Sequence, residues 1–263
     1  MSRHSVTSPF DLTAATFDRY RTLPRDVPEA IRRAIWSSTP KRSSARVLDL
    51  GAGTGRIGKA FVDAKDSYVG VDVSMPMLRE FLAGNGTAHL VQGRGQQLPL
   101  RDGTFDVVLL MHVLAGADDW RGLVREACRV LIPAGAIVVG HTKTPSTGVD
   151  AQLKRRLAAI LDEMGVASHR PHRPREHALA WLESSATRRV HLIAASWSAE
   201  WMPREFVARH RTGARFVALP AAVREEALQK LSTWVRDTFG SLDVALNEAY
   251  TFELDLFEIK PGC

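Results

Sequence analysis

The sequence predicts an α/β protein whose mainly parallel sheet carries helices on both faces. Between residues 45 and 142, short apolar segments alternate with helical segments of similar length, which is typical of right-handed βαβ units. Phe105–Met111 is apolar almost throughout, as expected for a strand buried on both faces. A length of 263 residues allows one large domain with a smaller addition.

The elements of the first half follow from apolar periodicity and from capping and turn residues. A mainly helical segment over 11–36, broken at 23–28, precedes a polar linker over 37–44. We then expect strand 46–50, helix 55–64, strand 68–73, helix 75–83 capped by Ser74, strands 88–92 and 105–111, helix 118–131 capped by Asp118 or Asp119, a turn at 133–135 and strand 136–140.

Beyond residue 142 the pattern is looser. We expect helices over 151–164 and 174–185, a strand over 189–197, a short helix from Pro203, a helix over 220–239 and a final strand over 250–259. The chain therefore divides into an N-terminal helical segment (1–44), a sheet core (45–144), a helical cap (145–187) and a C-terminal region that completes the sheet (188–263).

Composition excludes several classes of protein. Apolar residues make up 45% and charged residues 24% of the chain, which excludes general disorder. Cys128 and Cys263 cannot form a disulfide framework or a thiolate metal cluster, and a reducing setting fits them. With no secretory signal and no membrane-spanning run in the sequence, we expect a cytoplasmic protein without membrane association.

The positive charge is concentrated in one region. Residues 151–215 hold twelve Lys or Arg against six Asp or Glu, an excess equal to the net charge of +6 of the whole chain. Such a field favours an anionic small molecule, a nucleic acid or a membrane surface as a partner. Arginine-rich codon usage accounts for it equally well.

The main motif is VLDLGAGTGRIG over residues 47–58, which joins a buried strand to a helix. Glycines at 51, 53 and 55 let the backbone turn sharply and approach a ligand, and Asp72 ends the next strand. A carboxylate there can accept both hydroxyls of a ribose, so the motif predicts a nucleoside-containing ligand. The structural alternative is a tight turn beside a surface Asp.

Residues 53–58 also match the G-x-G-x-x-G pattern of dinucleotide-binding proteins. Two features oppose a dinucleotide. The charge of Asp49 disfavours a nearby pyrophosphate, and a helical segment precedes the first strand.

Several ordered motifs resemble those of class I S-adenosylmethionine-dependent methyltransferases. The similarity runs through LDLGAGTG (48–55), VGVDVSMPML (69–78), LPL (98–100), FDVV (105–108) and CRVLIPAG (128–135). It is strongest with the small-molecule branch that includes the quinone-biosynthesis enzymes. The resemblance implies a Rossmann-like sheet of seven strands, a helical cap inserted after strand five, and S-adenosylmethionine as the cofactor.

The resemblance also implies roles for individual residues. Asp72 would bind the ribose, Asp49 would lie near the methionine ammonium or hold the loop, and Met77 or a neighbour such as Val73 would pack on adenine. The N-terminal segment, with Arg21, would close over the site. The full set of implied cofactor residues is Tyr20, Asp49, Gly51, Gly53, Gly55, Asp72, Val73, Met77, Gly95, Gln96, Met111 and His112.

One position departs from the family pattern. An acid that accepts from the adenine amino group commonly follows strand three, and this chain has Arg94 there. An arginine cannot accept a hydrogen bond. Gln92, Gln96 or the Gly95 backbone are the substitutes that the sequence offers.

Methyl transfer needs a base only if the acceptor must lose a proton. His112, after strand four, is the first candidate and His141 the second, although a histidine at such a position also serves as a packing or capping residue. His169, His172 and His177 lie in a basic, proline-rich stretch, and we expect no metal there. The aromatic residues Trp197, Trp201 and Phe206 line an acceptor pocket or form core, and Cys128 is expected to be buried.

The function that the sequence favours is methyl transfer to a small anionic or aromatic acceptor. A nucleic-acid methyltransferase is an alternative suggested by the basic stretch, although no RNA-binding module or Asn-Pro-Pro-Tyr-type motif accompanies it. A non-catalytic cofactor-binding protein is suggested by Arg94, and an NAD-linked oxidoreductase by the glycine pattern.

Overall fold

The computed structural model describes residues 8, 10–11, 14–39, 45–84, 86–166, 174–211, 216 and 219–260. Its centre is a seven-stranded sheet in the order β3-β2-β1-β4-β5-β7-β6. The strands are β1 (Arg46–Leu50), β2 (Ser67–Asp72), β3 (His89–Gln92), β4 (Phe105–Met111), β5 (Leu131–Lys143), β6 (Ala186–Trp201) and β7 (Leu246–Ile259).

The first five strands are parallel to one another, and β7 is antiparallel to both β5 and β6. The carboxyl ends of β1, β2, β4 and β5 therefore meet along one edge of the sheet. In open α/β sheets, ligands bind at this edge where the strand order reverses, which here lies between β1 and β4.

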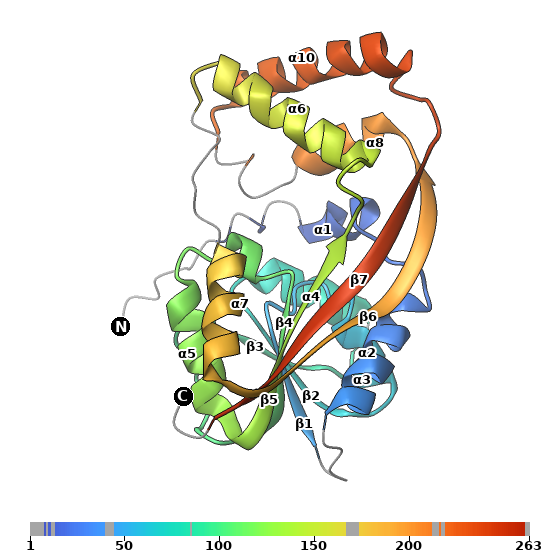
Figure 1. The fold of residues 1–263 in the computed structure, drawn as a ribbon. Coiled ribbons are helices and arrows are strands. Elements are labelled where there is room, and N and C mark those ends of the chain that lie inside the picture. The colour runs from blue at the N-terminus through green and yellow to red at the C-terminus, as the bar shows by residue number, and fades with distance from the viewer. Residues whose placement is uncertain are drawn as a thin grey trace.

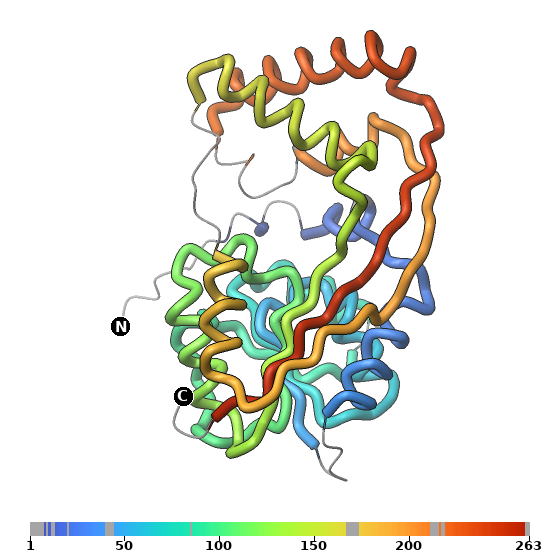
Figure 2. Tube along the Cα trace, viewed as in Figure 1, coloured from blue at the N-terminus to red at the C-terminus, as the bar shows by residue number. Residues whose placement is uncertain are grey.

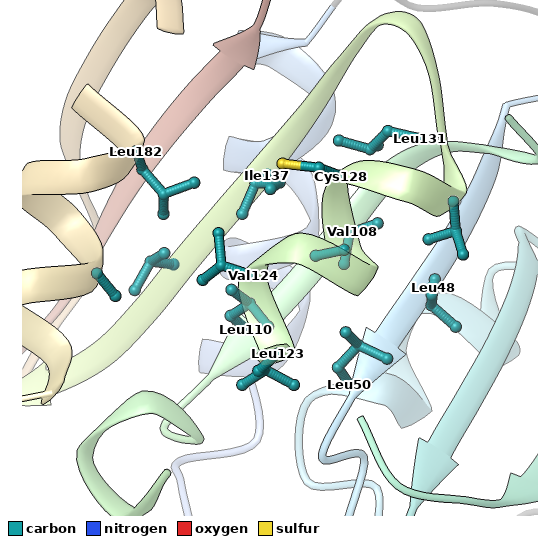
Figure 3. Close-up of a cluster of buried hydrophobic side chains, with 14 of the residues drawn as sticks. Leu48, Leu50, Val108, Leu110, Leu123, Val124, Cys128, Leu131, Ile137 and Leu182 are labelled. Carbon is teal, nitrogen blue, oxygen red and sulfur yellow. The ribbon is translucent and has the colours of Figure 1, made fainter. Parts of the chain in front are cut away.

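The helices of the sheet domain are α1 (Ala14–Phe17), η1 (Asp18–Tyr20), α2 (Val27–Ser38), α3 (Gly58–Asp63), α4 (Met75–Gly84), η2 (Leu114–Gly116), α5 (Trp120–Val130) and α7 (Pro174–Ser185). One face of the sheet packs on α5 and α7, where Leu123 and Leu182 join Ile137 in a buried cluster (Figure 3). Cys128 lies in the same cluster, as expected. The other face packs on α2 and α3 through Ile31, Ile35 and Phe61.

A separate cap consists of α6 (Val149–Glu163), α8 (Pro203–Arg211) and α10 (Ala221–Phe239). Its own core contains Leu157, Phe206, Leu231 and the half-buried Trp201. The long strands β6 and β7 run from the sheet up to this cap, and α1 lies between the cap and the sheet (Figures 1 and 2). Trp201 and Phe206 are therefore core of the cap, whereas Trp197 stacks on Tyr250 with ring centroids 5.4 Å apart.

The division of the C-terminal half differs from the expectation over 145–187. Helix α7 packs against α5 on the sheet, and the cap combines α6 with two helices that follow β6. The reason for the difference lies in tertiary packing, because Ala178 and Leu182 are fully buried against the sheet domain. Helical periodicity alone does not show which neighbouring element covers the apolar face of a helix.

Three element boundaries also differ from the expectation. Helix α3 begins at Gly58, because Gly55 has a φ of +82° that a helix cannot continue. The turn expected at 133–135 is a bulge within β5, since Phe105 pairs with Leu131 and Val107 with Ala136. Strands β6 and β7 exceed their expected lengths because they pair with each other as far as Trp201 and Leu246.

In the described part of the chain, no helix is long and apolar enough to cross a membrane.

Candidate functional site

The glycine-rich turn between β1 and α3 forms the base of the candidate site. Gly51, Gly53 and Gly55 all have positive φ, at +81°, +56° and +82°. A Cβ on Gly55 would lie 2.4 Å from the Phe81 ring. A Cβ on Gly53 would meet no heavy atom within 3.9 Å. The turn is therefore tightly packed beneath Gly55 and open beside Gly53, where a ligand can approach the backbone.

Asp72, at the end of β2, faces this turn. Its carboxylate accepts hydrogen bonds from the backbone N–H of Gly53 at 2.9 Å and of Ser74 at 2.8 Å. Burial raises the pKa of Asp72, and these backbone donors oppose the rise. Each carboxylate oxygen can accept a further bond, so Asp72 is able to hold the turn and still accept from ligand hydroxyls.

Asp49 lies beneath the same turn and is only 2% exposed. Its Oδ2 accepts a hydrogen bond of 2.8 Å from the Tyr68 hydroxyl, while Oδ1 is buried with no partner among the described residues. Burial raises the pKa of Asp49 to about 7, against the effect of the Tyr68 bond. A buried acceptor without a donor is costly, so a cationic or N–H group brought close to this atom would be stabilised.

His112 follows β4 and lies at the same edge of the sheet. Its φ is +59°, which is unusual for a residue with a side chain. Its backbone N–H donates to Gly140 O at 2.9 Å, and its Nε2 lies 3.5 Å from the Thr142 hydroxyl. Desolvation by the surrounding protein and the charge of Arg56 lower the pKa of His112; because the residue is exposed to solvent, water reduces the size of this shift. It is therefore neutral near pH 7 and a weak base.

His141, on β5, is held in one tautomer. Its Nδ1 lies 3.0 Å from the Arg175 Nη2, and a guanidinium can only donate, so Nδ1 accepts. The proton of the neutral ring must then be on Nε2, which lies 4.0 Å from Glu253 Oε2. Burial and the charge of Arg175 lower the pKa of His141. As long as Arg175 occupies Nδ1, this histidine has no free lone pair with which to act as a base.

The N-terminal segment lies against the glycine-rich turn. The Thr54 hydroxyl donates to Asp18 Oδ1 at 2.6 Å, and the Arg56 guanidinium donates to the Arg21 carbonyl. The guanidiniums of Arg21 and Arg56 lie 4.4 Å and 5.4 Å from the centroid of the Phe17 ring. These contacts place α1 and η1 over the turn. The side chain of Tyr20 lies outside the described part of the chain.

The other implied residues differ in their accessibility. Val73 is half-buried and Gln96 is exposed, whereas Met77 and Met111 are buried. Gly95 is in close contact with Leu123, because a Cβ at this glycine would lie 2.4 Å from Leu123 Cδ1.

Arg94 is exposed beside Gly95. The amide of Gln92 donates to the Val73 carbonyl at 3.1 Å, so a side chain after β3 does reach the segment that follows Asp72. This contact occupies the donor of Gln92 and leaves its amide oxygen as an acceptor.

Sequence patterns gave no indication of several contacts at this site. Tyr68 supports Asp49, Asp18 binds Thr54, and Ser74 donates to Asp11 Oδ1 at 2.6 Å. Each pair joins segments far apart in the chain, so no local spacing reports it.

No cluster of three potential metal ligands occurs within the described ranges. His177 packs near Trp120, with ring centroids 6.4 Å apart. His169 and His172 lie outside these ranges.

The site fits a nucleoside that carries a cationic amino-acid tail. Asp72 has carboxylate oxygens able to accept from hydroxyl groups, the backbone at Gly53 is open to close approach, and Oδ1 of Asp49, which has no hydrogen-bond partner among the described residues, suits an ammonium group.

Comparison with known proteins identifies the family of this chain. A family model described as a methyltransferase domain matches residues 48–139. The demethylmenaquinone methyltransferase of Mycolicibacterium gilvum is 31% identical over 228 residues, which cover 84% of this chain and 95% of that protein. The chain belongs to the class I S-adenosylmethionine-dependent methyltransferase family.

Other relatives of this chain match over a shorter range. The demethylmenaquinone methyltransferase of Streptomyces griseus is 32% identical over 148 residues, 54% of this chain, and the match spans 63% of that protein's length. Among solved structures, the YcgJ protein of Bacillus subtilis superposes with a TM-score of 0.55 over 88% of this chain and 98% of its own, at 20% identity. That likeness shows the shared fold.

Proposed function

We propose that the protein binds S-adenosylmethionine at the carboxyl ends of β1, β2 and β4 and transfers its methyl group to a small anionic or aromatic acceptor. The observation that carries this proposal is the arrangement of Asp72, the open backbone at Gly53 and the partnerless Asp49 oxygen around one turn. When bound, S-adenosylmethionine supplies a methyl group already activated on a sulfonium.

The chain's own contribution is binding and orientation. Asp72 would accept from the ribose hydroxyls while it keeps the turn in place through Gly53 and Ser74. Asp49 would accept from the ammonium group. Because an in-line displacement depends mainly on alignment, the remaining task is to hold the acceptor beside His112 and Met111, where β4 ends.

Proton removal is a minor part of this proposal. His112 is a weak base because its pKa is lowered, and His141 has its Nδ1 engaged by Arg175. Such a site suits an acceptor whose attacking atom is already ionised or has a free lone pair. An aromatic carboxylate meets this condition, and a quinone-type acceptor, as the names of the relatives suggest, meets it as the phenolate of its reduced form.

The test is transfer of a labelled methyl group from S-adenosylmethionine to a panel of acceptors. The panel contains a reduced naphthoquinone, a hydroxybenzoate and a short RNA, and each is analysed for methylated product by mass spectrometry. Product from either small molecule, with an equal amount of S-adenosylhomocysteine, is the expected result. Methylation of the RNA alone would replace the small-molecule assignment by the nucleic-acid one.

A further inference from the structure

The outer edge of strand β6 has no partner in the part of the chain that the structure describes. β6 lies at one end of the sheet and is 16 residues long, whereas β3, at the other end, has 4 residues. The backbone hydrogen bonds of β6 run to β7, on its inner side, and none of the described residues pairs with its outer side. Figures 1 and 2 show β6 as the outermost strand beside β7. A long edge strand of this kind presents a row of N–H and C=O groups to which another strand can bind.

The part of β6 that leads to the cap belongs to a ribbon of two strands. β5 pairs with β7 as far as Thr251. From Tyr250 to Leu246, β7 pairs with β6 alone among the described strands. Two strands without a third are marginally stable by themselves, so another strand along the outer edge of β6 would support the ribbon that carries the cap.

The two faces of β6 differ in what covers them. Helix α2 packs on the face that carries Val190, Leu192 and Trp197. Ile193 follows Leu192 and lies on the opposite face, because successive side chains of a strand alternate. It is 57% exposed, the highest value of any large apolar residue in the described ranges. A second strand beside β6 would remove part of this apolar surface from water.

Charged side chains of opposite sign lie near the two ends of β6. Arg189, near the start, is 40% exposed and donates to Glu183 at 2.7 Å and to Asp255 at 3.0 Å. These bonds leave other N–H groups of its guanidinium able to donate. Glu200, near the end, is exposed and has no partner among the described residues. Antiparallel pairing of a strand with its own copy brings opposite ends together, and with them these opposite charges.

We propose that β6 pairs antiparallel with β6 of a second copy of this chain, which forms a two-fold dimer with one sheet continuous through both copies. β6 has a bulge between Ile193 and Ala195, near its middle. The bulge shifts the alternation by one residue, so the side chains of Arg189 and Glu200 share a face. Pairing centred on the bulge places Arg189 of each copy opposite Glu200 of the other. Ile193 then lies opposite Ser196 at the centre, within reach of cross-strand contact.

A bulge and charged side chains also protect the edge strands of monomeric proteins from pairing. Protection predicts a monomer with an open β6 edge. Pairing predicts a dimer in which the amides of β6 are shielded from solvent.

The experiment is analytical ultracentrifugation of the full chain over a range of protein concentrations. Ile193→Lys places a charge at the centre of the edge, and Glu200→Arg places a positive charge opposite Arg189 of the other copy. The matched controls are Leu82→Lys and Glu80→Arg on α4. Both residues are exposed, and α4 packs on β2 and β3 at the other end of the sheet. Circular dichroism confirms that each variant folds.

We expect the unmodified protein to sediment with twice the mass of 29.0 kDa of one chain and to dissociate on dilution. Ile193→Lys and Glu200→Arg should each raise the dissociation constant of the dimer about tenfold or more, and both controls should match the unmodified protein. Hydrogen exchange followed by mass spectrometry should show slower exchange of the β6 amides at high than at low protein concentration. The amides of β3 should exchange at the same rate at both concentrations.

Either of two results would overturn the proposal. A monomer at every concentration would assign the bulge and the charges of β6 to protection of the edge. A dimer that both β6 variants leave unchanged, or whose β6 amides exchange at the same rate at high and low concentration, would place the interface elsewhere on the chain. None of these measurements involves the cofactor or the acceptor, so they are independent of the proposed function.

Discussion

Replacement of Gly55 by alanine tests whether the glycine-rich turn is shaped by packing as well as by backbone conformation. Gly55 has a φ of +82°, and an added Cβ would lie 2.4 Å from Cδ2 and 2.6 Å from Cγ of Phe81. Because Phe81 is 1% exposed, its ring cannot rotate into solvent to make room. Gly240 provides a matched control, with a φ of +83° and no heavy atom within 4 Å of its added Cβ.

The two substitutions share one cost and differ in another. A left-handed conformation costs an L-residue about 1–2 kcal/mol, and this applies equally to Gly55→Ala and Gly240→Ala. Overpacking against a buried ring adds roughly 1–3 kcal/mol at Gly55 only. Gly55→Ala should therefore lower the free energy of unfolding by about 2–5 kcal/mol in total.

Urea unfolding followed by circular dichroism measures both losses, and the difference between them isolates the contact with Phe81. At about 2–4 °C per kcal/mol for a chain of this size, thermal unfolding should separate the two variants as well. In a Gly55→Ala background, Phe81→Leu should recover part of the difference. Equal losses at positions 55 and 240 would refute the argument that Phe81 requires a glycine.

Three further predictions concern ionisable groups. Because the folded-state pKa of Asp49 is raised to about 7, the folded protein binds this proton more tightly than the unfolded chain. The free energy of unfolding should then fall as pH rises from about 4 to about 7, by up to roughly 4 kcal/mol. Asp49→Asn should remove this pH dependence in urea titrations at several pH values. An unchanged pH dependence would contradict the raised pKa of Asp49. Tyr68→Phe removes a hydrogen bond that favours the charged form of Asp49, so the same titrations should show the slope extending to higher pH, with stability at pH 7 lower by about 1–3 kcal/mol. Arg175→Gln removes a positive charge beside His141, so the pKa of His141 in an NMR titration should rise, whereas an exposed control, Arg188→Gln, should leave it unaltered.

The part of the fold that could be predicted from the sequence is the part that local patterns encode. β4 coincides with the expected strand at Phe105–Met111, because an apolar run buried on both faces is visible without knowledge of its neighbours. The sequence also limited the cap of α5 to Asp118 or Asp119, and the structure shows that the Asp119 carboxylate accepts from the Gly122 N–H at 2.8 Å. The sharp turn predicted at Gly51, Gly53 and Gly55 is present, and all three glycines have positive φ.

The cap and its contact with the N-terminal segment depend on residues that are far apart in the chain. Helical periodicity placed both α6 and α7 in the predicted cap. The burial of Leu182 against the sheet shows that α7 belongs to the sheet domain. Arg21 and Arg209 are 188 positions apart, so no motif could associate them. The charge excess over 151–215 was visible in the sequence, but its distribution over α6, α7, β6 and α8 was not.

The most direct test of S-adenosylmethionine binding at the glycine-rich turn is calorimetric titration with S-adenosylmethionine and, separately, with NADH. Both titrations are made on the unmodified protein and on Asp72→Asn. We expect S-adenosylmethionine to bind, NADH not to bind, and Asp72→Asn to lower the affinity about tenfold or more, because it removes charge-assisted bonds to the ribose. Binding of NADH in place of S-adenosylmethionine, or an affinity for S-adenosylmethionine that Asp72→Asn leaves unchanged, would contradict the account.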